Sequence, residues 1–487
     1  MELIQKSTFR SYLGKITKKI PIVHRLFVSI YHLAILEVWP RLMRISGLSK
    51  RSKALSRDLN EFLSLQSVQV LSLNISPPKS DKELVKLLAA ADIPFCEGGW
   101  TIYLPPSDEL SKVLPDILSY PANAGVKILR DIKPPQEASY TPNSLRPTPG
   151  AAHVRARTPD PKTLLRIAGY LSNEDIGPVV YDMVELEIGG VSCTAYICEH
   201  IESSGPITSD EYDAFIERLG TVLALGVIGI AHGDYRVSTD FAAPDCNGNL
   251  LKSNDGRMSY VDFQSFTFVD EKKAFQEWTK QSGSNILFGP RRLGKASNYL
   301  YQMIPGIGEA KRETITRWKF IDELLSDAHL ELDGRITFDI GCNSGLMSYY
   351  ALSKGAKWAY GWDQSNIANA SQELLRQLGA SRWTTFGGAI TEETNFLDSL
   401  PKEQLQENSG DGVLLYLAIS GHIGFPGAVA DLPWEYCIYE GHSNQDIELS
   451  IDKIKSSWSE NELKIHAKGK IKDDDSPARP FVIFSRH

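Results

Sequence analysis

The residues best suited to bind a ligand lie between Asp339 and Asp363. An apolar run ends near Asp339, and Gly341 and Gly345 follow before a second apolar segment begins. Glycines at these positions let the backbone turn sharply and approach a ligand closely. Asp363 closes the next apolar run, WAYGWD. A carboxylate there can accept hydrogen bonds from both hydroxyls of a ribose, so the spacing predicts a nucleoside-type site on a strand-turn-helix unit.

This pattern is D-x-G-x-x-x-G followed by an acidic residue that ends the next strand, and it resembles class I S-adenosylmethionine-dependent methyltransferases. The resemblance implies that Asp339 interacts with the ammonium group of S-adenosylmethionine and that Asp363 binds its ribose. It also implies that the turn at Gly388 and Ala389, after the third strand, lies against the adenine. A GxGxxG dinucleotide fingerprint is not met, which argues against NAD. The alternative is a strand-turn-helix unit of this kind that binds no cofactor.

The loop after the fourth expected strand, DGVLLYLAI, carries His422. In the same resemblance this loop faces the methyl donor and the acceptor. Because an imidazole titrates near neutral pH, His422 is a candidate general base or acceptor contact. Glu440 and His442, after the fifth strand, are weaker candidates on the same side of the sheet. The alternative is that His422 is a loop histidine without a chemical role.

A second group of chemically competent residues lies in the middle of the chain. Asp234 ends an H-G-D triplet, Asn249 begins an N-L-L run, and Asp262 lies in a V-D-F run that ends a strand. The three resemble the catalytic half of the protein-kinase-like fold, especially its bacterial small-molecule and lipopolysaccharide kinase branch. The resemblance implies that Asp234 orients an attacking hydroxyl and that Asp262 holds Mg²⁺ against the phosphates of ATP.

Upstream, Lys127 in AGVKILR resembles the strand lysine that grips the phosphates in this family. The family's metal-binding asparagine comes five residues after the catalytic aspartate, where this chain has Thr239. Asn249 is the favoured substitute as second metal ligand, and Asp240 is the other. The expected helix at 161–172 contains no glutamate to pair Lys127. The alternative is a kinase-like domain that has lost catalysis and serves as a scaffold.

The elements that must position these residues follow from the apolar patterning. From Arg335 onward, strand-like and helix-like segments alternate, which predicts a doubly wound parallel sheet closed by a terminal antiparallel pair. The helical stretch before it could cover the site, with these candidate residues: Tyr299, Tyr301, Arg312 and Trp318. Upstream we expect helix in 58–95, strands at WTIYLPP, AGVKILR, VVYDMVELE and SCTAYICEHI, and helices at 161–172 and 209–225.

Together these patterns predict an α/β and α+β multidomain protein, consistent with a length of 487 residues. A helical N-terminal region would occupy 1–74, a bilobal kinase-like domain 75–285, and a Rossmann-like class I methyltransferase domain with a helical preface 286–487. The six cysteines form no CxxC pair and no zinc spacing. This usage predicts a reducing, cytoplasmic compartment and no structural metal.

The net charge of −8 conceals a strong asymmetry. Residues 1–57 hold twelve Lys/Arg and two Glu, whereas the rest of the chain is acidic. The acidic body makes nucleic acid an unlikely partner. Charges and a proline interrupt the apolar stretch at 20–45, so we expect no membrane span there. We expect either a helix on the inner membrane surface or a helix that packs on protein, such as a glycosyltransferase partner.

A kinase-like domain joined to a methyltransferase resembles, in its parts, the bifunctional enzymes that terminate bacterial O-antigen chains, although the domain order is reversed. This resemblance implies phosphorylation and methylation of a cell-envelope glycan or related hydroxyl acceptor, with S-adenosylmethionine, ATP and Mg²⁺. One alternative is a sugar or small-molecule O-methyltransferase with an inactive kinase-like scaffold. Another is a non-catalytic protein that recruits partners to a membrane.

Overall fold

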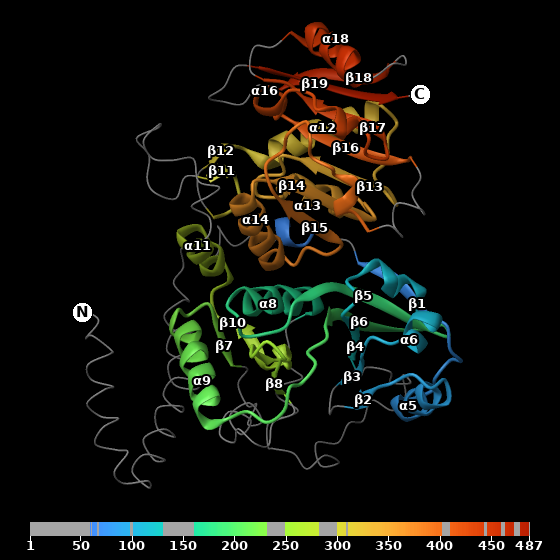
Figure 1. The fold of residues 1–487 in the computed structure, drawn as a ribbon, viewed down its shortest axis with the longest axis vertical. Coiled ribbons are helices and arrows are strands. Elements are labelled where there is room, and N and C mark those ends of the chain that lie inside the picture. The colour runs from blue at the N-terminus through green and yellow to red at the C-terminus, as the bar shows by residue number, and fades with distance from the viewer. Residues whose placement is uncertain are drawn as a thin grey trace, which may run out of the picture.

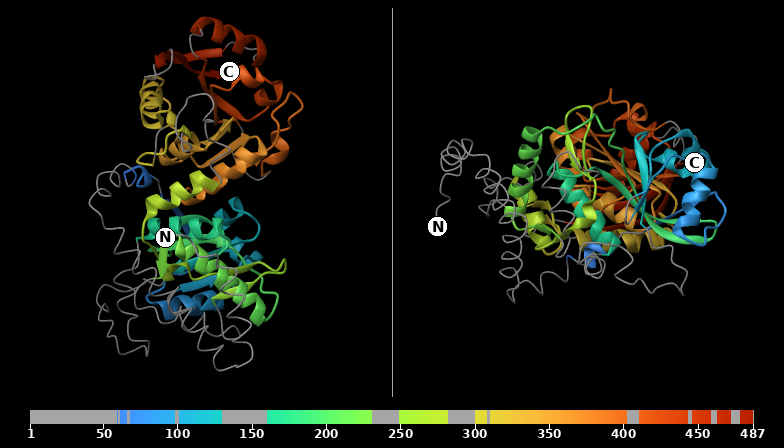
Figure 2. Two further views of the ribbon diagram at one scale, coloured as in Figure 1. Left: turned by 90° about the vertical axis from the view of Figure 1, so that its left-hand side faces the viewer. Right: turned by 90° about the horizontal axis from the view of Figure 1, so that it is seen from below.

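The structure is a computed structural model that describes residues 59, 61–65, 68–97, 101–129, 160–230, 249–281, 300–307, 310–401, 410–442, 446–458, 463–471 and 478–486. Two large β-sheets, each flanked by helices, lie one above the other along the long axis (Figure 1). The side view shows the same two stacked bodies (Figure 2). The seven-stranded sheet comes from the C-terminal part of the chain and the six-stranded sheet from the middle part.

The seven-stranded sheet has the order β15-β14-β13-β16-β17-β19-β18. Its strands are β13 (Ile336–Ile340), β14 (Trp358–Asp363), β15 (Trp383–Gly387), β16 (Gly412–Leu417), β17 (Trp434–Glu440), β18 (Leu463–Ile471) and β19 (Arg479–Arg486). The first five pair in parallel, whereas β19 runs antiparallel to both β17 and β18. The prediction of a parallel sheet closed by an antiparallel pair is confirmed.

Side chains alternate between the two faces of this sheet because successive residues of a strand point in opposite directions. Phe338 and Tyr416 belong to a hydrophobic cluster on one face, and Leu415 belongs to a cluster on the other. Both faces are therefore buried, as expected for parallel strands. The associated helices are α12 (Thr314–Asp327), α13 (Leu346–Ser353), α14 (Ser365–Gln377), α16 (Ser420–Ile423), α17 (Gly427–Ala430) and α18 (Ile447–Trp458), with the 3-10 turn η6 (Leu397–Ser399).

The six-stranded sheet has the order β1-β5-β6-β4-β3-β2. Its strands are β1 (Gln69–Leu73), β2 (Cys96–Glu97), β3 (Thr101–Leu104), β4 (Ala124–Leu129), β5 (Val180–Ile188) and β6 (Val191–Glu199). All pairs are antiparallel except β1 with β5. The helices in this part are α5 (Asp81–Ala90), α6 (Asp108–Val113), η2 (Pro115–Ser119) and α8 (Pro161–Asn173).

The segment after β6 contains α9 (Ser209–Ala224), β7 (Ile228–Ile230), β8 (Leu250–Lys252), β9 (Met258–Tyr260), η3 (Phe263–Ser265), β10 (Phe266–Phe268) and α11 (Glu271–Gln281). β8 pairs with β9, and β10 pairs with β7, both antiparallel. The short parallel pair β11 (Leu300–Gln302) and β12 (Ala310–Arg312) then precedes α12. α9 begins after Thr208, which forms a capping box with Glu211.

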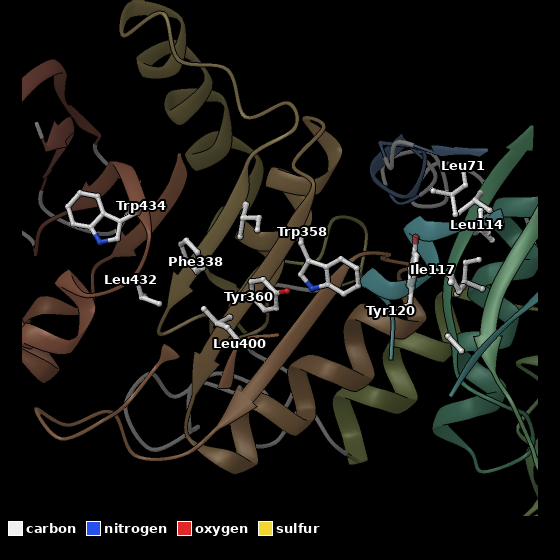
Figure 3. Packing of buried hydrophobic residues seen from close by; sticks show 14 of the residues in the cluster. Leu71, Leu114, Ile117, Tyr120, Phe338, Trp358, Tyr360, Leu400, Leu432 and Trp434 are labelled. Atoms are coloured by element: carbon white, nitrogen blue, oxygen red, sulfur yellow. The ribbon is translucent and has the colours of Figure 1, made fainter. Parts of the chain in front are cut away.

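The two sheets share one hydrophobic cluster, so the two bodies pack closely. Tyr120, which follows η2, meets the edge of Trp358 on β14 with ring centroids 5.6 Å apart (Figure 3). On the other side of this contact α8 crosses α14. A Cβ on Gly169 would lie only 2.0 Å from the carbonyl oxygen of Arg376, so the helices approach at a distance that only glycine permits.

The segment expected to be helical in 58–95 is helical only in part. α5 is confirmed, but β1 is a strand and pairs with β5, although it lies within the predicted N-terminal region. Near residue 62 a helical turn packs on the seven-stranded body, where the Tyr349 hydroxyl donates to the Phe62 carbonyl at 3.1 Å. The basic segment at 1–57 lies outside the described residues. No helix in the described ranges is long and apolar enough to cross a membrane.

Candidate functional site

The turn at the carboxyl end of β13 has backbone angles at two positions that favour glycine. Gly341 has φ +76°, and Gly345, the N-cap of α13, has φ +74°. A Cβ on Gly341 would lie 2.7 Å from Cδ1 of Ile419, and one on Gly345 would lie 2.6 Å from Oγ of Ser371. Any other residue at either position is therefore strained and crowded. The predicted ligand-binding turn is formed as the spacing indicated.

Asp363 lies at the end of β14, directly beside this turn. Its Oδ2 accepts a hydrogen bond of 2.9 Å from the amide of Asn343 within the turn, and its Oδ1 accepts one of 2.8 Å from the amide of Gln364. Each carboxylate oxygen has two lone pairs, so both can still accept a bond from a ribose hydroxyl. Burial raises the pKa of Asp363, while the two amides lower it. The carboxylate is thus oriented before any ligand binds.

Asp339 is buried at 2% exposure and accepts a hydrogen bond of 2.8 Å from the Ser348 hydroxyl of α13. The pKa of Asp339 is raised to about 6, chiefly by burial, and the neighbouring Asp363 acts in the same direction. Ser348 and the Arg317 guanidinium act in the opposite direction. A buried carboxylate of this kind gains most from a cationic ligand group, because a nearby positive charge favours its ionised form.

Gly388 and Ala389, predicted to lie against adenine, follow β15 and are exposed. The amide of Gly388 donates to the carbonyl of Asp363 at 2.9 Å, so this turn is joined to the end of β14. A Cβ on Gly388 would meet nothing within 4 Å. The structure therefore brings together all six residues predicted for the cofactor: Asp339, Gly341, Gly345, Asp363, Gly388 and Ala389.

His422 lies on the short helix α16 after β16 and is exposed. Its ring meets that of His442 edge-on, with centroids 5.8 Å apart. The amide of Gly421 donates to Nε2 of His442 at 2.7 Å, which assigns the proton of neutral His442 to Nδ1. Burial, His422 and Arg312 all lower the pKa of His442. The loops after β16 and β17 thus present two imidazoles together at the carboxyl edge of the sheet.

Glu440 has a different environment from the one expected for an acceptor contact. It is buried at 1% exposure between two arginines, with Oε1 accepting from Nη1 of Arg479 at 2.5 Å and Oε2 accepting from Arg317. This buried triad joins β17, β19 and α12. Sequence reasoning missed it because the three residues lie on separate segments. No sequence signal could have found it, because each of the three segments also holds other charged residues.

The segment before α12 covers part of the glycine turn, as expected for a preface. Gln302 on β11 accepts a hydrogen bond from the Ser344 hydroxyl within the turn. Arg312 on β12 is buried, and its guanidinium lies 5.7 Å from the centroid of Tyr301. Trp318 on α12 is buried and stacks on Tyr350 of α13. Of the predicted preface residues, Tyr299 lies outside the described ranges.

The second predicted site is described only in part, because Asp234, Thr239 and Asp240 lie outside the described residues. Lys127 on β4 and Asp262 lie close together, with Nζ 4.0 Å from Oδ1, although they are far apart in the chain. Lys127 Nζ also donates to the Val261 carbonyl at 2.7 Å. The Asn249 carbonyl accepts a bond of 2.7 Å from the amide of Val261, which places Asn249 beside Asp262. Where the chain is described, no group of three or more metal-ligating side chains occurs.

The chain is similar, over parts of its length, to several methyltransferases. No family model matches the chain. Protein arginine N-methyltransferase 1 from Chlamydomonas reinhardtii is 28% identical over 93 residues, which is 19% of this chain, and the chain spans only 27% of that curated relative. Magnesium protoporphyrin IX methyltransferase from Synechocystis, solved with bound S-adenosylmethionine, is 16% identical with a TM-score of 0.30, covering 45% of this chain and 98% of that one.

A putative S-adenosylmethionine-dependent methyltransferase from Listeria monocytogenes is 13% identical with a TM-score of 0.27, covering 36% of this chain and 100% of that one. These overall scores are low, so the strand order and the site carry the assignment. In the seven-stranded sheet the first strand lies between the second and the fourth, and the last strand is inserted between the fifth and the sixth. With Gly341 and Asp363 at the carboxyl edge, the C-terminal part of the chain has the fold of class I methyltransferases that use S-adenosylmethionine.

Proposed function

We propose that this protein transfers a methyl group from S-adenosylmethionine to an acceptor bound beside His422 and His442. The observation that carries the proposal is the direct hydrogen bond between Asp363 and the glycine turn, which joins the ribose-binding carboxylate to the turn that approaches the ligand. When bound, S-adenosylmethionine supplies an electrophilic methyl group on a sulfonium centre. The chain supplies binding and orientation, which alone can remove much of the barrier to a two-substrate reaction.

Each residue has a separate role in this proposal. Asp339 faces the ammonium group, Asp363 binds the ribose hydroxyls, and Gly388 and Ala389 border the adenine. Ser348 orients Asp339 through its hydroxyl. The proton on Nδ1 of His442 is available to donate to an acceptor oxygen, because Nε2 already accepts from Gly421.

The acceptor we propose is a phosphorylated glycan or a related oxygen acceptor. Support comes from the groups on the acceptor side: Arg312 on β12 lies near enough to lower the pKa of His442, and the His422 ring lies beside that imidazole. A phosphate oxygen is already anionic, so its methylation requires positioning rather than a general base. If the acceptor is instead a sugar hydroxyl, His422 acts as the base, and His422→Asn then lowers kcat far more than KM.

We further propose that the middle of the chain is a kinase-like domain that binds ATP and Mg²⁺. The strand order β2-β3-β4-β6-β5 supports this, because it is the order expected when a lysine strand lies beside the strand that leads to the hinge. The approach of Lys127 to Asp262 also supports it, since a phosphate and its metal ion require a cation and a carboxylate side by side. Asn249 would complete the metal site. The alternative remains an inactive scaffold of the same shape.

The methyltransferase proposal is tested with radiolabelled S-adenosylmethionine and a pool of candidate acceptors, with and without prior phosphorylation. Asp363→Ala should reduce incorporation at least tenfold. The matched control is Asp398→Ala, on the exposed turn η6, which should leave it unchanged. Label transfer that is the same in wild type and Asp363→Ala would overturn the proposal.

The phosphoryl-transfer proposal is tested with radiolabelled ATP and the same acceptors. Asp262→Asn should abolish labelling, because an amide does not replace the carboxylate at a magnesium ion. Asp255→Asn is the control, since Asp255 lies in the exposed turn between β8 and β9. If neither wild type nor variant transfers phosphate while methyl transfer persists, the domain is a scaffold.

For the N-terminal region we propose binding to an anionic membrane surface or to a glycosyltransferase, through the basic residues in 1–57. Flotation with liposomes that contain anionic lipid tests the first case. Removal of residues 1–57 should abolish flotation, and undiminished flotation of the truncated chain would reject a surface helix.

A further inference from the structure

The stacked bodies enclose a cavity of about 1060 Å³ that neither proposed active site uses. We call it the interdomain cavity. Tyr120 and Tyr181 line it from the six-stranded body, and Trp358, Trp383, Phe386 and Arg376 line it from the seven-stranded body. Pockets of several hundred to a thousand Å³ are of the size that binds small organic ligands. Tyr120 and Trp358, whose rings lie in contact (Figure 3), are both among the lining residues.

The aromatic walls have few free polar groups. The indole N–H of Trp358 donates to Oγ1 of Thr384 at 3.1 Å, and that of Trp383 donates to the Ala380 carbonyl at 2.9 Å. Trp383 and Phe386 remain half-buried, on the edge strand β15. Their rings therefore offer flat apolar surface, which suits a planar or ring-shaped ligand.

Arg376 is a cationic group of the cavity, and its side chain is half-buried. Burial lowers the pKa of Arg376, whereas Tyr181, Glu199 and Glu373 act to raise it. No hydrogen bond or ion pair of its guanidinium is formed with any part of the chain that the structure describes. Glu199 is instead engaged by Arg257. The N–H groups of the Arg376 guanidinium therefore remain available to donate to an anionic ligand in the cavity.

Arg382, which also lines the cavity, differs from Arg376 because a buried carboxylate lies close to its guanidinium. It is 7% exposed, and its Nε lies 4.0 Å from Oδ2 of Asp182. Asp182 in turn accepts a hydrogen bond of 2.6 Å from the Tyr120 hydroxyl. Arg382 is thus matched by a buried carboxylate of the other body. The one other acidic side chain in the described lining, Asp108, is exposed.

The backbone of α14 at Arg376 is held against α8. Its carbonyl oxygen contacts Gly169 of α8, and Nδ2 of Asn173 on α8 donates to the carbonyl of Glu373 at 2.7 Å. Gln372, which also lines the cavity, lies four residues before Arg376 on α14 and so presents its amide on the same helix face. A guanidinium and an amide on one fixed face can together contact an anionic group.

We propose that the interdomain cavity binds a small organic anion that carries a ring, with Arg376 contacting its carboxylate or phosphate and Trp383 and Phe386 packing against the ring. A guanidinium recognises either anion through two parallel N–H···O bonds. The ligand contacts both bodies, so its binding also stabilises their association.

The test uses the full chain saturated with S-adenosylhomocysteine, so that the cofactor site is not available to the probes. Benzoate, phenyl phosphate and glucose 1-phosphate are titrated by calorimetry and by tryptophan fluorescence, beside the uncharged analogues benzamide, phenol and glucose. We expect saturable binding of at least one anion and at least tenfold weaker binding of its uncharged analogue. The carboxylate and phosphate arms show which anion the site takes.

The variants separate a binding role from a structural one. Arg376→Gln should weaken anion binding at least tenfold, and Arg376→Lys should weaken it less. The control Lys86→Gln, on the exposed face of α5, should bind as wild type does. Because Arg376→Gln removes an uncompensated cation, its unfolding temperature should equal or exceed that of wild type.

Three results would overturn the proposal. The first is that no anionic probe binds saturably. The second is that Arg376→Gln binds the probes as tightly as wild type. The third is that Arg376→Gln unfolds at a clearly lower temperature than Lys86→Gln, which would make Arg376 a structural residue.

Discussion

Asp339 and Asp363, the two carboxylates of the cofactor site, lie in unlike environments. Asp363 is half-buried and accepts two backbone amides, whereas Asp339 is buried and accepts one hydroxyl. Both positions could be predicted from the sequence, because each ends an apolar strand next to a glycine turn. The environment of Asp339 could not be predicted, because Arg317 and Ser348 come from the separate helices α12 and α13.

We predict that cofactor binding depends on pH through Asp339. With a pKa of about 6, Asp339 is ionised at pH 7.5 but largely protonated at pH 5. Binding of S-adenosylhomocysteine, which carries the same ammonium group, should weaken about tenfold over this interval. Calorimetry at the two pH values measures it. In Asp339→Asn most of the pH dependence should vanish, and an unchanged dependence would contradict the assignment.

Protonation of Asp339 also makes the free energy of unfolding depend on pH. The native state holds this proton more tightly than the unfolded chain, because the folded pKa is raised above the ordinary value of 3.8. Its contribution therefore disfavours folding as pH rises from about 4 to about 6. Asp339→Asn should remove that part of the dependence when unfolding by denaturant is compared at several pH values.

At the scale of elements, the apolar runs predicted most strands because both faces of the parallel sheet are buried. β1 was not predicted, because its five residues, QVLSL, adjoin a helical pattern. Its partner in the sheet is β5, which lies more than a hundred residues later in the chain. The triad of Arg317, Glu440 and Arg479 was not predicted for the same reason. Contacts between distant segments leave no periodic signal in the sequence.

We predict that Glu440→Gln strongly destabilises the C-terminal body. The substitution leaves two buried guanidiniums without a carboxylate, which costs about 3–5 kcal/mol. The control is Glu435→Gln, because Glu435 pairs with Arg335 where both side chains are partly exposed, and its loss should cost about 1 kcal/mol or less. Denaturant unfolding measures both. Equal effects of the two substitutions would show that the triad does not join β17, β19 and α12.

At the scale of the whole molecule, the two bodies meet through α8 and the C-terminal end of α14, the helix that follows Asp363. Nothing in the sequence indicated this contact or the interdomain cavity, because both depend on how two separately patterned sheets are stacked. Because α8 contacts α14, the proposed nucleotide-binding body lies against the helix that follows Asp363. A change at this interface should therefore affect both bodies.

We predict that Gly169→Ala forces α8 and α14 apart. Its Cβ would lie 2.0 Å from the Arg376 carbonyl oxygen, and backbone cannot yield cheaply. We expect a loss of about 1–3 kcal/mol and faster proteolysis between the two bodies. Gly427→Ala is the control, because its Cβ would meet nothing within 4 Å. Indistinguishable proteolysis of the two variants would contradict the close packing.

The central claim is that the C-terminal body binds S-adenosylmethionine through Asp363 and the glycine turn. Calorimetry of S-adenosylmethionine with wild type, Asp363→Ala and the control Asp398→Ala tests it most directly. We predict one-site binding by wild type and Asp398→Ala, and at least tenfold weaker binding by Asp363→Ala. Absence of binding to wild type, or equal affinity for all three proteins, would contradict the claim.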